Sequence, residues 1–138
     1  MIPILIDTGP LVALLNRKDY YHKWCVRQVS QLKPPLYTCE AVLTEAFYLL
    51  KGSHQVGRRL NDLLMTGRVE LTTNIPDNLL RVCRLMDTYR DVPMAFADAC
   101  LVCLCEEMDS RIFTLDGDFR IYRRRRNRTI SLLIPEGR

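Results

Sequence analysis

Short apolar runs alternate along this chain with longer segments in which apolar residues recur every three or four positions. Five of the runs have the length of buried strands, and the first of them is also rich in β-branched residues. We predict strands at residues 2–6, 36–39, 69–72, 112–115 and 130–134.

The longer segments carry the periodicity and the flanking signals of helices. Pro10 and Pro93 stand near helix starts, and Gly52 and Gly67 follow helix ends. We predict helices at residues 11–15, 20–32, 41–50, 56–65, 77–89 and 94–108. Because strands and helices alternate, the pattern predicts an α/β fold with a mainly parallel sheet of five strands and helices on both faces. No repeat or linker interrupts it, so residues 1–138 are interpreted as a single domain.

Composition and charge narrow the class of protein only slightly. The chain has 138 residues, of which 48% are hydrophobic and 26% charged, as in ordinary globular proteins. A net charge of +4 is weak evidence for a nucleic-acid partner. The apolar start is too short for a signal peptide, and nothing approaches the roughly 18 apolar residues of a membrane helix. We therefore expect a cytoplasmic protein without a membrane partner.

Six cysteines raise the question of disulfides or zinc. Cys100 and Cys103 form a CxxC pair, but no second pair supplies the four ligands of a structural zinc site. Most of the cysteines lie in apolar stretches, where Cys behaves as a small buried hydrophobe. We expect buried free thiols.

Acidic residues follow two of the predicted strands directly. Asp7 comes after the first strand, and Asp116 and Asp118 come after the fourth. In open α/β sheets, functional residues gather at the carboxyl ends of strands, so these acids can converge on one crevice. Taken singly, Asp7 could instead cap the next helix, and Asp116 and Asp118 could be ordinary turn residues.

Two further acids, Glu45 and Asp98, lie inside apolar helices. A buried carboxylate is costly unless something compensates its charge, and no Lys or Arg stands one turn from Asp98. Mg²⁺ or Mn²⁺ is the alternative, because hard cations take oxygen ligands. A cation held by carboxylates supports phosphodiester hydrolysis without a His or Cys nucleophile. The open alternatives are a solvent-facing Glu45 and an Asp98 that only complements its helix terminus.

These residues, in this order, resemble the PIN-domain family, in particular toxin ribonucleases of the virulence-associated protein C (VapC) type. The resemblance lies in the blocks at residues 4–8, 43–46, 93–102 and 112–120. It implies a three-layer α/β/α fold and Mg²⁺- or Mn²⁺-dependent cleavage of single-stranded RNA. Carried over by position, the acidic residues are Asp7, Glu45, Asp98 and Asp116, with Asp118 as a further metal ligand and with Thr8 and Thr114 as supporting hydroxyls.

The resemblance also implies partners. Toxin members pair with a small antitoxin, which often inserts a basic side chain into the active site, and they are usually homodimers. One departure is Ala95, where relatives often carry another acid. Two alternatives stay open: a PIN nuclease of RNA maturation or decay that is not a toxin, and an inactive PIN-like module that holds RNA or a partner.

A dense run of arginines follows the Asp116 turn. Such a run can bind RNA phosphates beside the acids, and the candidates are Arg120, Arg123, Arg124, Arg125 and Arg126, with Arg128 beyond them. It could equally be a solvated loop, or a site for an acidic segment of an antitoxin. The sequence Asp7-Thr8-Gly9 also matches aspartic proteases, but those are nearly all-β and this chain is predicted to be mostly helical.

Overall fold

A parallel five-stranded sheet forms the centre of the protein. The computed structural model describes residues 1–73 and 75–138. The strand order is β3-β2-β1-β4-β7, and every neighbouring pair is parallel. The strands are β1 (Ile4–Ile6), β2 (Leu36–Thr38), β3 (Val69–Leu71), β4 (Arg111–Phe113) and β7 (Leu132–Leu133).

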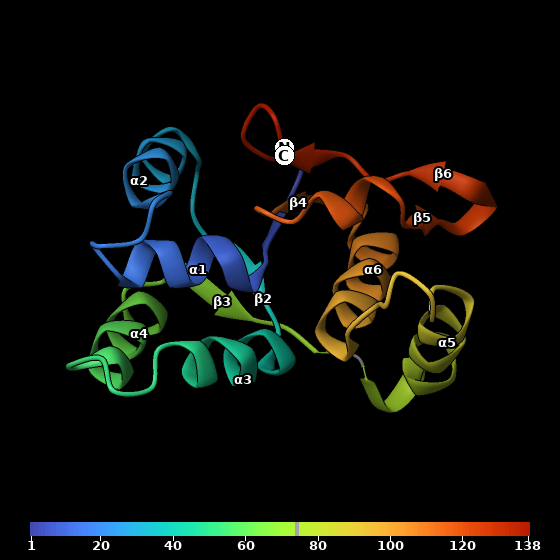
Figure 1. Cartoon of the computed structure of the whole chain (residues 1–138), viewed down its shortest axis with the longest axis horizontal. Coiled ribbons are helices and arrows are strands. Elements are labelled where there is room, and N and C mark those ends of the chain that lie inside the picture. Colours follow the sequence, from blue (N-terminus) through green and yellow to red (C-terminus); the bar gives the residue numbers. More distant parts are fainter. Residues whose placement is uncertain (74) are drawn as a thin grey trace.

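Six α-helices of the described chain flank this sheet. In Figure 1, α1 to α4 gather on one side of the molecule and α5 and α6 on the other. The helices are α1 (Thr8–Leu15), α2 (His22–Gln31), α3 (Glu40–Leu49), α4 (Val56–Met65), α5 (Ile75–Thr88) and α6 (Phe96–Met108). The predicted α/β fold with a parallel five-stranded sheet is confirmed.

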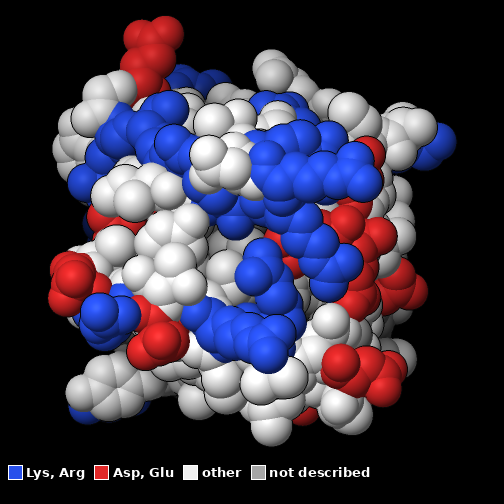
Figure 2. Space-filling model, turned by 90° about the vertical axis from the view of Figure 1, so that its right-hand side faces the viewer, with Lys and Arg blue, Asp and Glu red and all other residues white. Residues whose placement is uncertain are grey.

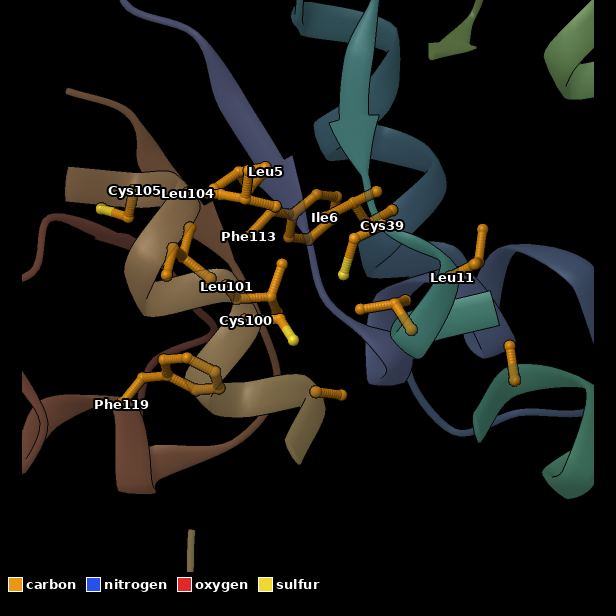
Figure 3. Packing of buried hydrophobic residues seen from close by; sticks show 14 of the residues in the cluster. Leu5, Ile6, Leu11, Cys39, Cys100, Leu101, Leu104, Cys105, Phe113 and Phe119 are labelled. Atoms are coloured by element: carbon orange, nitrogen blue, oxygen red, sulfur yellow. The ribbon is translucent and has the colours of Figure 1, made fainter. Parts of the chain in front are cut away.

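The core lies between the two central strands and α6. Leu5 and Ile6 of β1 and Ile112 and Phe113 of β4 are fully buried, and every residue of α6 from Ala97 to Cys105 is buried as well. Figure 3 shows Leu5, Ile6 and Phe113 of the strands beside Leu101 and Leu104 of α6. Each such aliphatic side chain contributes about 1.5–3 kcal/mol when buried. This packing holds α6 in place against the sheet. Because Asp98 lies in the first turn of α6, its position is fixed as well.

Several predicted boundaries differ from the observed ones for local reasons. The first strand starts at Ile4, since Ile2 remains 61% exposed. Helix α1 begins at Thr8 rather than residue 11, because Asp7 caps it and Pro10 is tolerated in a first turn. The last strand shrinks to Leu132–Leu133.

The arginine-rich segment holds structure that the apolar pattern did not predict. A 3-10 turn, η1 (Gly117–Arg120), precedes a short antiparallel pair formed by β5 (Arg123–Arg124) and β6 (Arg128–Thr129), and a second 3-10 turn, η2 (Arg125–Asn127), connects these two strands. All six cysteines are free, and five of them are buried, as expected; Cys83 is exposed. No helix in the described part of the chain is long and apolar enough to span a bilayer.

Candidate active site

Asp7 lies where β1 ends and α1 begins. Its Oδ1 accepts a hydrogen bond of 2.7 Å from the Thr8 backbone N–H, and its Oδ2 accepts one of 2.7 Å from the Thr114 hydroxyl. Asp7 is only 5% exposed. The capping role that the sequence left open is therefore real, and it fixes the carboxylate at the carboxyl end of the central strand.

Asp98 is held in the first turn of α6 in a comparable way. Its Oδ2 accepts hydrogen bonds of 3.1 Å from the Ala95 backbone N–H and of 3.1 Å from the hydroxyl of the fully buried Tyr122. Both donors share one oxygen, and no hydrogen bond from the described residues reaches Oδ1. Asp98 thus complements its helix terminus and keeps one oxygen available for a ligand.

Two threonines connect the remaining acids to Asp7. The Thr8 hydroxyl donates to Glu45 Oε1 over 2.8 Å, which links α1 to α3. Thr114 donates to Asp7 and accepts from the Asp116 backbone N–H over 3.0 Å. The two hydroxyls that the family resemblance marked as supporting therefore orient the carboxylates of Glu45 and Asp7, and Thr114 also fixes the backbone of Asp116.

Asp116 and Asp118 form the turn that follows β4. The Asp118 backbone N–H donates to Asp116 Oδ1 over 2.9 Å, so Asp116 caps the η1 turn. Asp116 is exposed and Asp118 is half-buried. The turn role and a role in the site are thus compatible.

All five acids line one open cavity of about 700 Å³. A sixth acid, Asp19, lines it as well, and Arg138 is the one Lys or Arg among the described residues around it. Ala95 also lines the cavity, so an acid at that position would point into the same space. The cavity is therefore strongly acidic and suited to a cation or a cationic side chain.

The acids perturb one another's protonation. Burial raises the pKa of Asp7 to about 7; hydrogen bonds from Thr114 and Thr8 oppose this, and the charges of Asp98 and Glu45 add to it. Burial likewise raises the pKa of Asp98 to about 6, against the hydrogen bonds from Ala95 and Tyr122. Such shifts, in a cavity, are characteristic of functional sites.

The donor chemistry fits a hard divalent cation. Carboxylate and hydroxyl oxygens surround the cavity, and they are ligands that such a cation takes. Burial, with a smaller contribution from the neighbouring carboxylates, disfavours the ionised forms of Asp7 and Asp98, which a bound cation would favour. The carboxylates are nevertheless held apart: within residues 1–73 and 75–138, no three Asp, Glu, His or Cys side chains are close enough together to hold an ion as they stand. A cation held by three of these side chains would therefore require small side-chain rotations toward the cavity.

The predicted arginine cluster divides into structural and exposed members. Figure 2 shows Lys and Arg side chains gathered on the face that carries α5 and the β5–β6 hairpin. Arg123 Nη1 donates to the carbonyls of Arg120, Ile121 and Tyr122, and Arg120 Nε donates to the Arg138 carbonyl over 2.8 Å. These two side chains hold the turn together.

Arg124, one of the candidates for binding phosphates, is largely buried. Its side chain is 12% exposed and pairs with Asp109 over 2.8 Å. The Arg125 backbone N–H donates to Glu106 Oε2, and its side chain lies 3.8 Å from the same carboxylate. Arg126 and Arg128 are exposed. The arginines best placed to meet a phosphate are therefore the two at the tip of the hairpin.

Residues beyond the predicted set also shape the site. Tyr122 bonds to Asp98, Arg138 enters the cavity wall, and Tyr20 and Tyr21 line its edge. Nothing in their spacing along the chain relates them to the acids, because the contacts arise only when the sheet has formed.

The fold and the acidic cavity define a known class of protein: the chain belongs to the PIN-domain family, whose model matches residues 4–125. Among solved structures it is similar to Mycobacterium tuberculosis VapC20, described as a toxin that cleaves the sarcin-ricin loop. The identity is 20%, with 83% of this chain and 91% of that chain covered and a TM-score of 0.75.

A second similar structure is VapBC2 from Rickettsia felis, bound to a DNA fragment from its promoter. Here the identity is 12%, with 98% of this chain and 100% of that chain covered and a TM-score of 0.64. At these identities the two structures establish a shared fold. No curated protein matches the sequence.

Proposed function

We propose that this protein is a metal-dependent endoribonuclease that cleaves single-stranded RNA, and that it is the toxin of a toxin–antitoxin pair. The observation that carries the proposal is the meeting of Asp7, Glu45, Asp98 and Asp116 at one cavity. Membership in the PIN-domain family and the likeness to two VapC-type structures support it.

In the proposed mechanism, Asp7, Glu45, Asp98, Asp116 and Asp118 hold Mg²⁺ or Mn²⁺. When bound, the cation supplies charge to the phosphodiester and makes an attacking water more acidic. The chain's own groups keep the carboxylates in place: Thr8 orients Glu45, Thr114 orients Asp7, and Tyr122 orients Asp98. The carboxylates at the cavity also provide sites that can accept the proton of the water.

We expect the purified protein to cleave single-stranded RNA when Mg²⁺ or Mn²⁺ is present and to stop when EDTA is added. Cleavage at full rate in EDTA, with metal-free reagents, would contradict the metal mechanism. An inactive binding module would retain RNA without cutting it at any metal concentration, so the same titration separates the two functions.

The toxin role needs a separate test, because a nuclease of RNA maturation has the same chemistry. Six acids around the cavity offer a binding site for a basic side chain inserted by an antitoxin. Induced expression of the chain should arrest growth, and a small antitoxin encoded beside it should relieve the arrest. Normal growth during expression of a protein that is active on RNA would favour maturation or decay.

We propose a homodimer as well. Three consecutive residues of α3, Phe47, Tyr48 and Leu49, are 46%, 64% and 61% exposed, which is a large apolar surface for one helix end. Light scattering after gel filtration measures the molar mass directly. The mass of a single chain at micromolar concentration would contradict this proposal.

We further propose that the hairpin tip binds phosphates. Changing Arg126 and Arg128 to Gln should lower RNA affinity and flatten its dependence on salt by about 0.7 per lost phosphate contact. Cleavage at saturating RNA should stay near the parent rate, because the acids are untouched. Filter binding over a range of salt concentrations gives the slope.

The matched control changes two exposed arginines on other elements, Arg27 of α2 and Arg58 of α4, so that the net charge falls equally. Equal losses of affinity in both double variants would mean that total charge matters and the hairpin does not. Arg124→Gln should instead lower the melting temperature, since it removes the packing of a side chain that is only 12% exposed together with its ion pair with Asp109.

A further inference from the structure

Two tyrosines at the edge of the acidic cavity stand out because one of them is almost fully exposed. Tyr20 and Tyr21 lie in the turn between α1 and α2, and both line the same cavity as the carboxylates. Tyr20 is 90% exposed, although an aromatic ring gains much from burial. The rings meet edge to face, with centroids 4.8 Å apart and an angle of 78°.

The turn that carries Tyr20 is held firmly. Asp19 Oδ1 accepts from the Tyr21 backbone N–H over 2.9 Å, and the Asp19 carbonyl accepts from the His22 backbone N–H over 3.0 Å. The His22 ring Nδ1 lies 2.7 Å from the Ala13 carbonyl, which ties the turn to α1. The exposed ring is therefore presented by an ordered turn, with little freedom left to lose when something binds it.

A cation lies beside the aromatic pair. The Arg138 guanidinium is 5.2 Å from the centre of the Tyr21 ring, within the range of a cation–π contact. The bond from Arg120 Nε to the Arg138 carbonyl keeps this residue at the rim. One positive charge and one open aromatic ring thus stand next to an otherwise acidic cavity.

We propose that Tyr20 is a stacking platform for an unpaired nucleobase, and that Arg138 binds a phosphate next to that base. The proposal rests on the ribonuclease function proposed above and adds a substrate-positioning site to it. An aromatic side chain stacks on any base, whereas the bases of a duplex are already stacked and closed to it. Tyr20 would therefore select single strands without selecting a sequence.

The test compares Tyr20→Ala, Tyr20→Phe and Met65→Ala on a mixed-sequence single-stranded oligoribonucleotide. Met65 is the control: its side chain is large, apolar and 77% exposed, it lies on α4, and it is not among the residues lining the cavity. Loss of one stacked base should raise KM about 5- to 150-fold in Tyr20→Ala, with kcat near the parent value. Tyr20→Phe and Met65→Ala should keep the parent KM.

A spectroscopic measurement separates stacking from a general effect on affinity. An oligoribonucleotide that contains 2-aminopurine should lose fluorescence on binding the non-cleaving Asp98→Asn protein, because stacking quenches the base. Adding Tyr20→Ala should abolish the quenching at saturating protein, and adding Tyr20→Phe should preserve it. Arg138→Gln should flatten the salt dependence of binding by about 0.7.

The outcomes distinguish this inference from the function on which it rests. If the parent protein cleaves no RNA with either metal, the proposed function fails and the stacking site falls with it. If the parent cleaves RNA and Tyr20→Ala matches Met65→Ala in KM and quenching, only the stacking site is wrong.

Discussion

Asp98→Asn should reduce RNA cleavage by about 100-fold or more, while the melting temperature in EDTA stays the same or rises. The substitution removes the negative charge that is proposed to bind the cation. It preserves the local hydrogen bonds, because Ala95 and Tyr122 both donate to a single oxygen of Asp98, which the Asn carbonyl can replace. Removing a charge whose pKa is raised by burial also relieves a cost of folding.

Two measurements test this prediction together: single-turnover cleavage with Mn²⁺, and thermal unfolding in EDTA. Asp87→Asn is the control, since it makes the same chemical change on the exposed face of α5. It should leave both properties near their parent values. A large fall in the melting temperature of Asp98→Asn would show that Asp98 serves the fold, and parental cleavage would remove it from the proposed metal site.

The free energy of unfolding of Asp7→Asn, plotted against pH, should cross that of the parent protein, because the parent loses stability as pH rises. The folded-state pKa of Asp7 is about 7 and its ordinary value is 3.8, so the folded protein holds a proton that the unfolded chain releases. The contribution of Asp7 to the free energy of unfolding is therefore fully present below pH 3.8. It falls as pH rises from 3.8 to about 7, by an amount on the order of 4 kcal/mol. Asn does not ionise and escapes this loss.

At acidic pH the order reverses, because the variant lacks one good hydrogen bond. An Asn amide can keep the bond from the Thr8 N–H but presents a donor where Asp7 accepts from the Thr114 hydroxyl, at a cost of about 1 kcal/mol. Urea unfolding in EDTA from pH 4 to pH 8 measures the free energy of unfolding of both proteins on the acidic side and on the neutral side of the crossing. Parallel curves across that range would contradict the raised pKa.

Divalent metal provides a further comparison for the same pair of proteins. At pH 8, Mg²⁺ or Mn²⁺ should stabilise the parent, since the ion binds only the folded state. Asp7→Asn should gain much less. Equal stabilisation of the two proteins would mean that the cation binds elsewhere.

Much of the fold follows from residue patterns that act locally. The apolar runs around Leu5 and Ile112 are short and β-branched, and they become the central strands because both of their faces are covered. The β5–β6 hairpin escaped prediction because four arginines in a row conceal the alternation that a strand normally shows. Its shape depends on ion pairs with Asp109 and Glu106, which are tertiary contacts.

The candidate site likewise has a part that the sequence predicts and a part that depends on tertiary contacts. Its acids could be predicted because they are charges at strand ends or in apolar helices, where they are costly. Whether Asp7, Glu45, Asp98 and Asp116 are catalytic stays a prediction, although they do line one cavity. The contact between Tyr122 and Asp98 could not be predicted, since it joins residues 24 positions apart through the packing of α6.

The strand order has a consequence for the time at which the cavity comes into existence during synthesis. β1 occupies the middle of the sheet, yet it pairs on one side with β4, and the hydrogen bond between Asp7 and Thr114 spans 107 positions. A ribosome has therefore translated most of the chain before the first acid can meet its partner. The cavity is therefore complete only after β4 and the turn that follows it have been synthesised and have joined the sheet. The time of that step is set by the slow formation of long-range contacts.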